Sequence, residues 1–277
     1  MDALLPSQPE RYWQLMKRSL LLYRKSFFKT FLFALCFAVI TFTPRYIAVS
    51  IGQESFIPGP FLNSYHLLLL FIDIIALPFF IAIVWHMSCI TRQVDEPARE
   101  DMMIGIHKVI KVFLAILIQA FLILCLAFSF VTLQRIYLQE YLQLIQHTIG
   151  ALLLSMFFIL QLFLLLYVQT LFVFLLPLIV IEKNSILNAI KNSILLVWNH
   201  WWRTFSFQAT PWAIYLLILL TIKLIFGVNI HVFFIRDTPH HILAALSNTL
   251  IFALWIPWVA ATLLVQLRDL ELRIKRK

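Results

Sequence analysis

Charged residues are scarce in this chain, and several long stretches contain none. Asp, Glu, Lys and Arg together make up 13% of its 277 residues, whereas hydrophobic residues make up 62%. Soluble domains contain about 25% charged residues, so this composition excludes an ordinary soluble fold. A mean hydropathy of +0.91 agrees with a chain whose main solvent is a lipid bilayer.

Cysteines and catalytic motifs are also few or missing. The three cysteines, Cys36, Cys89 and Cys125, lie in or beside apolar runs and form no CxxC pair, which is typical of small buried hydrophobic residues. The chain contains no GxGxxG, GKS, GKT, HExxH or GxSxG motif. We therefore predict a protein that is not an enzyme, with no catalytic residue, no metal ligand and no cofactor.

Two groups of residues resemble metal ligands in type but not in spacing. The residues His231, Asp237, His240 and His241 gather in one outer loop, where they are interpreted as solvated side chains. His86 and Cys89 lie three positions apart at the inner end of a predicted span. We expect them to pack within the membrane domain rather than to bind a metal.

Six apolar runs are each long enough for a transmembrane helix. A bilayer core requires about 20 apolar residues in a helix, and a transmembrane strand would instead alternate polar and apolar residues. These runs are apolar on every face, so the sequence predicts an all-α integral membrane protein with a single six-span domain. The predicted spans cover residues 30–51, 66–91, 112–134, 150–181, 205–228 and 244–267. The prolines Pro78, Pro177 and Pro257 are expected to kink three of them.

Basic residues gather between alternate spans. Of the 22 Lys and Arg residues, 18 lie before residue 30, in residues 91–111, in residues 182–203 or after residue 267. Basic flanks stay on the cytoplasmic side of a membrane, so both termini are predicted to be cytoplasmic, with no cleaved signal peptide. The expected partners of these flanks are membrane lipids with anionic headgroups, and not nucleic acid.

Amphipathic helices are predicted in the basic segments. In residues 182–203, apolar side chains repeat at helical spacing opposite polar ones. We expect a helix over residues 184–203 to lie in the inner headgroup layer, with similar interfacial helices over residues 10–29 and 98–111. The residues expected to face lipid in the clearest of these helices are Ile190, Lys191, Ile194, Trp198, Trp201, Trp202 and Arg203.

An internal repeat is visible in these segments. Residues 16–31 and 190–205 are identical at six of 16 positions, which include the pairs Ser19 with Ser193 and Thr30 with Thr204. A weaker third copy is placed at residues 102–113. Three copies would make the protein a series of interfacial helices, each followed by a membrane hairpin. Chance similarity between two apolar helices is the alternative, because a restricted alphabet inflates matches.

The segment FLLPLIVIEKNSILNAIKNSILLVWNHWWRTF resembles the signature of YciC-like bacterial inner-membrane proteins, which are similar to the membrane domain of some glycerophosphodiester phosphodiesterases. The resemblance lies in Pro177 and the apolar residues after it, Glu182, the small residues of the next helix and the aromatic-basic entry at residues 201–203. It covers the C-terminal half well and the N-terminal half by general plan. It implies a six-span protein of the bacterial cytoplasmic membrane, without a phosphodiesterase domain.

Polar residues inside the spans are the remaining candidates for function, because a charge there is costly. Asp73 and Lys223 are predicted at similar depth near the outer surface, either as an ion pair or snorkelling lysine or as a polar site. Gln119, Gln161, Gln169 and Asn248 are expected to bond neighbouring helices. The function predicted from all this is a non-enzymatic role in lipid or envelope homeostasis. The alternative is a transporter or permease component with its site near Asp73.

Overall fold

The computed structural model describes residues 4–50, 64–133, 147–182, 184–226 and 241–275, and every regular element in these ranges is a helix. Six stretches are long and apolar enough to cross a membrane, so the predicted all-α, six-span class is confirmed. The helices are α1 (Tyr12–Ser50), α2 (Ser64–Thr91), α3 (Ala98–Leu133), α5 (His147–Leu171), α6 (Leu175–Val180), α7 (Ile186–Trp198), α8 (Trp201–Phe226) and α9 (His241–Lys275).

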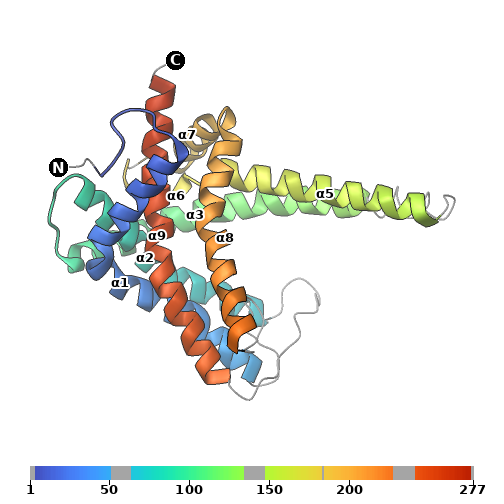
Figure 1. Ribbon diagram of the computed structural model, residues 1–277, viewed down its shortest axis with the longest axis horizontal. Helices are drawn as coiled ribbons and strands as arrows, with labels where there is room; N and C mark the ends of the chain where they lie inside the picture. Colours follow the sequence, from blue (N-terminus) through green and yellow to red (C-terminus); the bar gives the residue numbers. More distant parts are fainter. Residues whose placement is uncertain (1–3, 51–63, 134–146, 183, 227–240, 276–277) are drawn as a thin grey trace.

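The last helix, α9, lies at the centre of the structure. It packs against α1, α2, α7 and α8, and Figure 1 shows it as the upright red helix with α1 on one side and α8 on the other. In its most apolar stretch 72% of the residues are buried. Two cores meet along it: one joins α9 to α1 and α2, and the other joins its C-terminal part to α3, α6 and α7.

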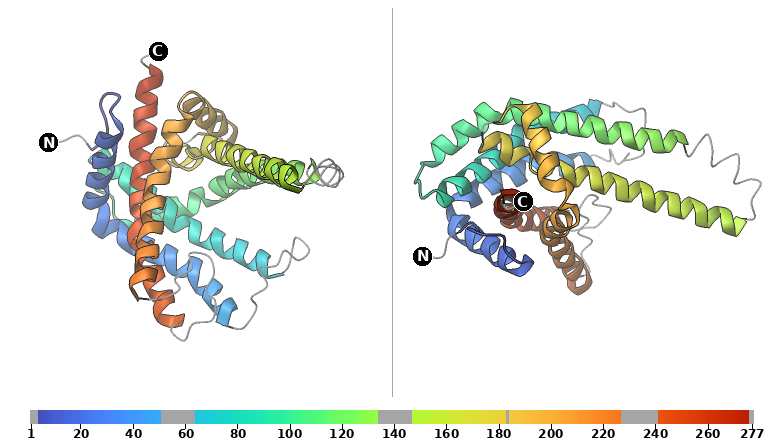
Figure 2. Two further views of the ribbon diagram at one scale, coloured as in Figure 1. Left: turned by 45° about the vertical axis from the view of Figure 1, so that its right-hand side comes forward. Right: turned by 90° about the horizontal axis from the view of Figure 1, so that it is seen from above.

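Helices α3 and α5 form a long hairpin that projects from the other helices. Figures 1 and 2 show them side by side and directed crosswise to α9. The Gln119 side chain donates a hydrogen bond to Gln169 Oε1 at 2.8 Å, and Phe130 meets Phe157 edge to face with ring centroids 5.5 Å apart. Only 11% of the most apolar stretch of α3 is buried, so most of the hairpin surface has no protein cover within the described residues.

Two of the predicted interfacial helices continue directly into their spans. Residues 10–29 and 98–111 lie almost entirely within α1 and α3, which run without interruption to residues 50 and 133. No proline lies within α3, and the one in α1 is Pro44, near its end, so nothing stops either helix at the expected boundary. The third predicted helix, over residues 184–203, is separate but shorter: α7 ends at Trp198, and residues 201–203 belong to α8, which begins at Trp201.

The fourth span is broken instead of continuous. A single helix over residues 150–181 was predicted with a kink at Pro177, but α5 ends at Leu171 and the short α6 begins at Leu175. The turn between them is closed by bonds from Phe172 N to Gln169 O and from Val173 N to Thr170 O. A proline ring clashes with the carbonyl four residues earlier, which here belongs to Val173, so the break falls before the proline.

The two clearest repeat copies place matched residues in matched environments. Ser19 and Ser193 are both fully buried, as are Thr30 and Thr204. Each threonine hydroxyl donates to the carbonyl four residues earlier, Thr30 to Ser26 and Thr204 to His200. The similarity between residues 16–31 and 190–205 therefore extends from sequence to burial, although only the second copy is divided into two helices.

Helices α2 and α3 approach each other closely at a glycine. A Cβ atom added at Gly105 would lie 2.4 Å from the backbone carbonyl oxygen of Pro78. Backbone cannot yield as a flexible side chain does, so only glycine permits this contact. The residue thus sets the distance between the first turns of α3 and the middle of α2.

Substitution of Gly105 by alanine should lower stability by about 1–3 kcal/mol, the usual cost of overpacking, and valine should cost more. Thermal unfolding of the purified protein in detergent measures this effect. The control is Ile106→Ala, because Ile106 is 55% exposed beside it. Equal melting temperatures for wild type and Gly105→Ala would contradict the close approach.

Candidate functional site

Helix α7 and the start of α8 have two apolar faces, and three of the residues predicted to face lipid lie on the face that packs against protein. Ile190, Ile194 and Trp201 are partly buried and pack against the second core. Trp201 also stacks on Phe205 with ring centroids 5.6 Å apart. The lipid-facing assignment made from the sequence is therefore corrected for these three residues. The hydrophobic pattern located an apolar face, but it could not show that a core lies behind it.

The exposed face of α7 carries a second stripe, which we call the α7 stripe. Its members on α7 follow one another at spacings of three or four residues and so lie on one side of that helix. They are Leu187, Lys191, Leu195 and Trp198, to which we add the exposed Trp202 in the first turn of α8. Trp198 and Trp202 are 59% and 66% exposed, and the contact with lipid predicted for them stays a prediction. The stripe combines large apolar side chains with a cation, the pattern of a helix in an anionic headgroup layer.

Arg203, also predicted to face lipid, instead belongs to a charge cluster at the ends of α8 and α9. Its guanidinium lies 3.1 Å from Asp269 Oδ2, and the Arg273 guanidinium lies 2.9 Å from the same oxygen. The carboxylate of Asp269 is fully buried. Two cations thus compensate one buried anion. A buried charge needs this compensation, whereas a charge on the surface is stabilised by water.

The same cluster holds the chain segment before α1. The Glu10 backbone N–H donates to Asp269 Oδ1 at 2.9 Å, and Arg203 and Arg273 both donate to the Glu10 carbonyl oxygen. The Glu10 side chain accepts from Arg18 at 2.6 Å. Residues 10, 203 and 269 are therefore joined by a single network. Asp269 was not predicted from the sequence. The one feature that could have indicated it is its place as an acidic residue among the basic residues that follow the last span.

A carboxylate pair lies beside this cluster. Partial removal from water, and then the neighbouring carboxylate of Glu271, raise the pKa of Glu182, which the family resemblance had singled out. Asn184 opposes this by donating to Glu182 Oε2 at 2.9 Å, and Glu271 is paired with Arg268 at 2.9 Å. The contact joins the segment before α7 to α9.

Three of the four uncharged polar residues predicted to bond neighbouring helices do so. Gln119 and Gln169 join α3 to α5, as described above. Asn248 in α9 accepts from the Tyr215 hydroxyl at 2.8 Å and donates to the Tyr46 hydroxyl at 3.0 Å. A buried amide is thereby satisfied from α8 and α1, which joins these two helices to the first part of α9. Gln161 is half-buried on α5.

The predicted ion pair between Asp73 and Lys223 is not among the ion pairs of the described residues. Both side chains are exposed, Asp73 on α2 and Lys223 near the end of α8. The helices on which α8 packs most are α9, α5 and α7, which leaves it away from α2. Their similar depth could be inferred from the sequence, but the order of helices around the bundle could not. Of the outer-loop group, His231, Asp237 and His240 lie outside the described residues, and His241 begins α9.

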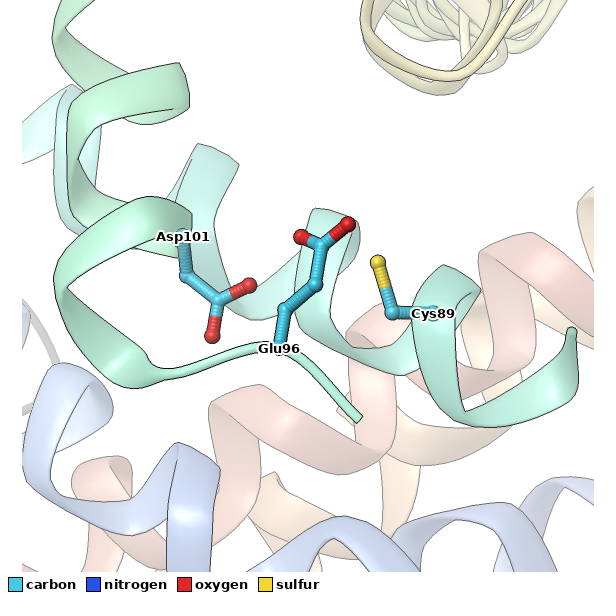
Figure 3. Close-up of side chains that lie close together, drawn as sticks. All are labelled: Cys89, Glu96 and Asp101. Carbon is cyan, nitrogen blue, oxygen red and sulfur yellow. The ribbon is translucent and has the colours of Figure 1, made fainter. Parts of the chain in front are cut away.

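A buried polar cluster lies where α2 turns into α3. Asp101 and His86 are almost fully buried, and His86 Nδ1 lies 2.7 Å from Asp101 Oδ2. Cys89, Glu96 and Asp101 place their sulfur and carboxylate oxygens within 4.8 Å of one another (Figure 3). The Trp85 indole donates to Glu96 Oε2 at 2.8 Å. Sequence analysis noted His86 and Cys89 but missed both carboxylates, which lie across a turn from them.

Comparison of this chain with protein-family models, curated proteins and solved structures found no match. The resemblance to YciC-like proteins therefore stays a prediction from the residues quoted for it.

Replacement of Asp269 by asparagine should cost about 3 kcal/mol of stability, because it leaves two partly buried guanidinium groups without their anion. Glu271→Gln is the matched control on the same helix. It removes an acid whose pair with Arg268 is more exposed, and it should cost less than about 1 kcal/mol. Thermal unfolding in detergent measures both, and similar losses would show that the Asp269 network does not hold the helix ends.

Proposed function

We propose that this chain is a non-enzymatic, multi-pass protein of the bacterial cytoplasmic membrane that binds anionic lipid in the inner leaflet and acts in lipid or envelope homeostasis. The observation that carries the proposal is the α7 stripe. Helix α7 is fixed to the protein by one apolar face and presents a second one, with Lys191 among its exposed residues. A helix so placed, together with the first turn of α8, holds two tryptophans and a cation at the depth of lipid headgroups.

The α3–α5 hairpin supports the same proposal. Its exposed side chains include Phe121 at 66% and Phe128 at 69%, and they surround the hairpin instead of lining one side. Hydrocarbon is the solvent that suits such a surface, because a large apolar side chain left fully exposed to water costs about 1.5–3 kcal/mol relative to a buried one. The hairpin and the α7 stripe together offer a lipid both a surface for its acyl chains and a cation for its headgroup.

The first test compares lipid binding by two matched triple variants. Lys191→Gln with Trp198→Ala and Trp202→Ala removes the charge and the aromatic rings of the stripe. The control is Lys275→Gln with Trp212→Ala, together with Leu217→Ala. These positions are also exposed but lie on α8 and α9 outside the stripe.

Native mass spectrometry with phosphatidylglycerol should show affinity about tenfold or more weaker for the stripe variant. A lysine near an anionic surface contributes about 1 kcal/mol, and the tryptophans add apolar burial. The control should bind as wild type does. Equal binding by all three proteins would overturn the stripe as the lipid site.

Orientation in the membrane is tested separately. If the basic segments face the cytoplasm, alkaline phosphatase fused after Lys277 should be inactive, whereas fusions near Pro58 or Pro239 should be active. The enzyme folds only outside the cytoplasm, where its disulfides form. An active fusion after Lys277 would reverse the orientation and place α7 in the other leaflet.

A further inference from the structure

The cluster at the α2–α3 turn combines three side chains of types that bind metal ions. Cys89 lies in the last turn of α2, Glu96 in the connecting segment and Asp101 in the first turn of α3. Figure 3 shows the three side chains directed toward a common space. Their ligand atoms lie within 4.8 Å of one another. Tetrahedral coordination at about 2.0–2.3 Å would bring such atoms to about 3.5 Å, a shift that side-chain rotation can provide.

Unsatisfied buried atoms are the second and independent observation. Asp101 is fully buried, and its Oδ1 has no hydrogen-bond partner within the described structure. His86 Nε2 is buried and unpartnered in the same way. A buried carboxylate oxygen without a donor is costly, and a cation is the ligand that would satisfy it.

The remaining atoms of the cluster are already oriented. Asp101 Oδ2 is held by His86 Nδ1, and Glu96 Oε2 by the indole of Trp85. Metal-binding carboxylates are commonly fixed in this way by a hydrogen bond to one oxygen. The arrangement thus leaves one oxygen of each carboxylate for a metal ion, together with the sulfur of Cys89.

We propose that Cys89, Glu96 and Asp101 bind one divalent transition-metal ion, of which Zn²⁺ is the best match. The thiolate disfavours Mg²⁺ and Ca²⁺, which prefer oxygen ligands alone. Binding forms a metal–sulfur bond and releases the thiol proton of Cys89 to solvent. Three protein ligands leave a fourth position for water. The ion would join the end of α2 to the start of α3.

Co²⁺ alone is the first probe, since cobalt replaces zinc and a cobalt–thiolate bond has a characteristic near-ultraviolet absorption. Full-length, tag-free protein in detergent should bind one equivalent with this absorption. Cys89→Ser should abolish it, and Glu96→Gln should weaken binding about tenfold or more. Cys36→Ser and Cys125→Ser are the matched controls, because neither cysteine belongs to the cluster, and they should bind as wild type does.

Two further measurements separate loss of the site from loss of the fold. Each variant is first compared with wild type by gel filtration and thermal unfolding without metal. Zn²⁺ should then raise the melting temperature of wild type and should protect Cys89 from alkylation in a protein that lacks Cys36 and Cys125. Absence of the cobalt–thiolate absorption in wild type, or its persistence in folded Cys89→Ser, would overturn the proposal.

Discussion

The buried carboxylate of Asp269 is the interaction on which one end of this structure depends, the end where α1 and α8 begin and α9 ends. Two arginines, one from the start of α8 and one from the end of α9, converge on it, and the Glu10 peptide group is bound by all three side chains. One charge cluster thus fixes the entry to α1, the entry to α8 and the end of the central helix. A buried anion demands such compensation, so these chain segments must meet where they do.

The helices of the rest of the molecule differ in their surroundings, which are either other helices or hydrocarbon. Helix α9 is mostly enclosed, whereas α3 is mostly bare. The bare surfaces remain apolar on every side, and the polar groups within the bundle, such as Asn248, are bonded to neighbouring helices. Association in lipid relies on such bonds and on close packing, of which the contact of Gly105 with Pro78 is the sharpest instance.

The helices themselves could be predicted from the sequence because each is a local property. Runs of apolar residues fixed the six spans, and Ser185 caps α7 within a residue of its expected start. The helix boundaries predicted at residues 30 and 112 are wrong, since no residue there stops a helix and amphipathicity alone does not end one. The break before Pro177 follows from the same chemistry that predicted a kink, but it falls one turn earlier.

The candidate site was harder to predict, because it depends on which segments meet. The periodicity of α7 revealed apolar residues but not which of them face protein, and so Ile190, Ile194 and Trp201 were assigned to lipid. The Asp269 network joins residues more than 190 positions apart, and no local pattern indicates such a contact. The carboxylates beside Cys89 are nearer in sequence, but only the fold of the α2–α3 turn brings them together.

The central claim is that lipid, and not protein, covers the α3–α5 hairpin and the α7 stripe. Spin labels at Phe121, Phe128 and Trp202, in nanodiscs that each hold one protein, test it most directly. Relaxation by oxygen, which concentrates in hydrocarbon, should be strong for labels at Phe121 and Phe128. It should be weak for a control label at Ala253, which is buried. The label at Trp202 should be relaxed by a lipid whose headgroup chelates nickel. Labels that neither reagent reaches, or that a water-soluble nickel complex relaxes instead, would contradict the account.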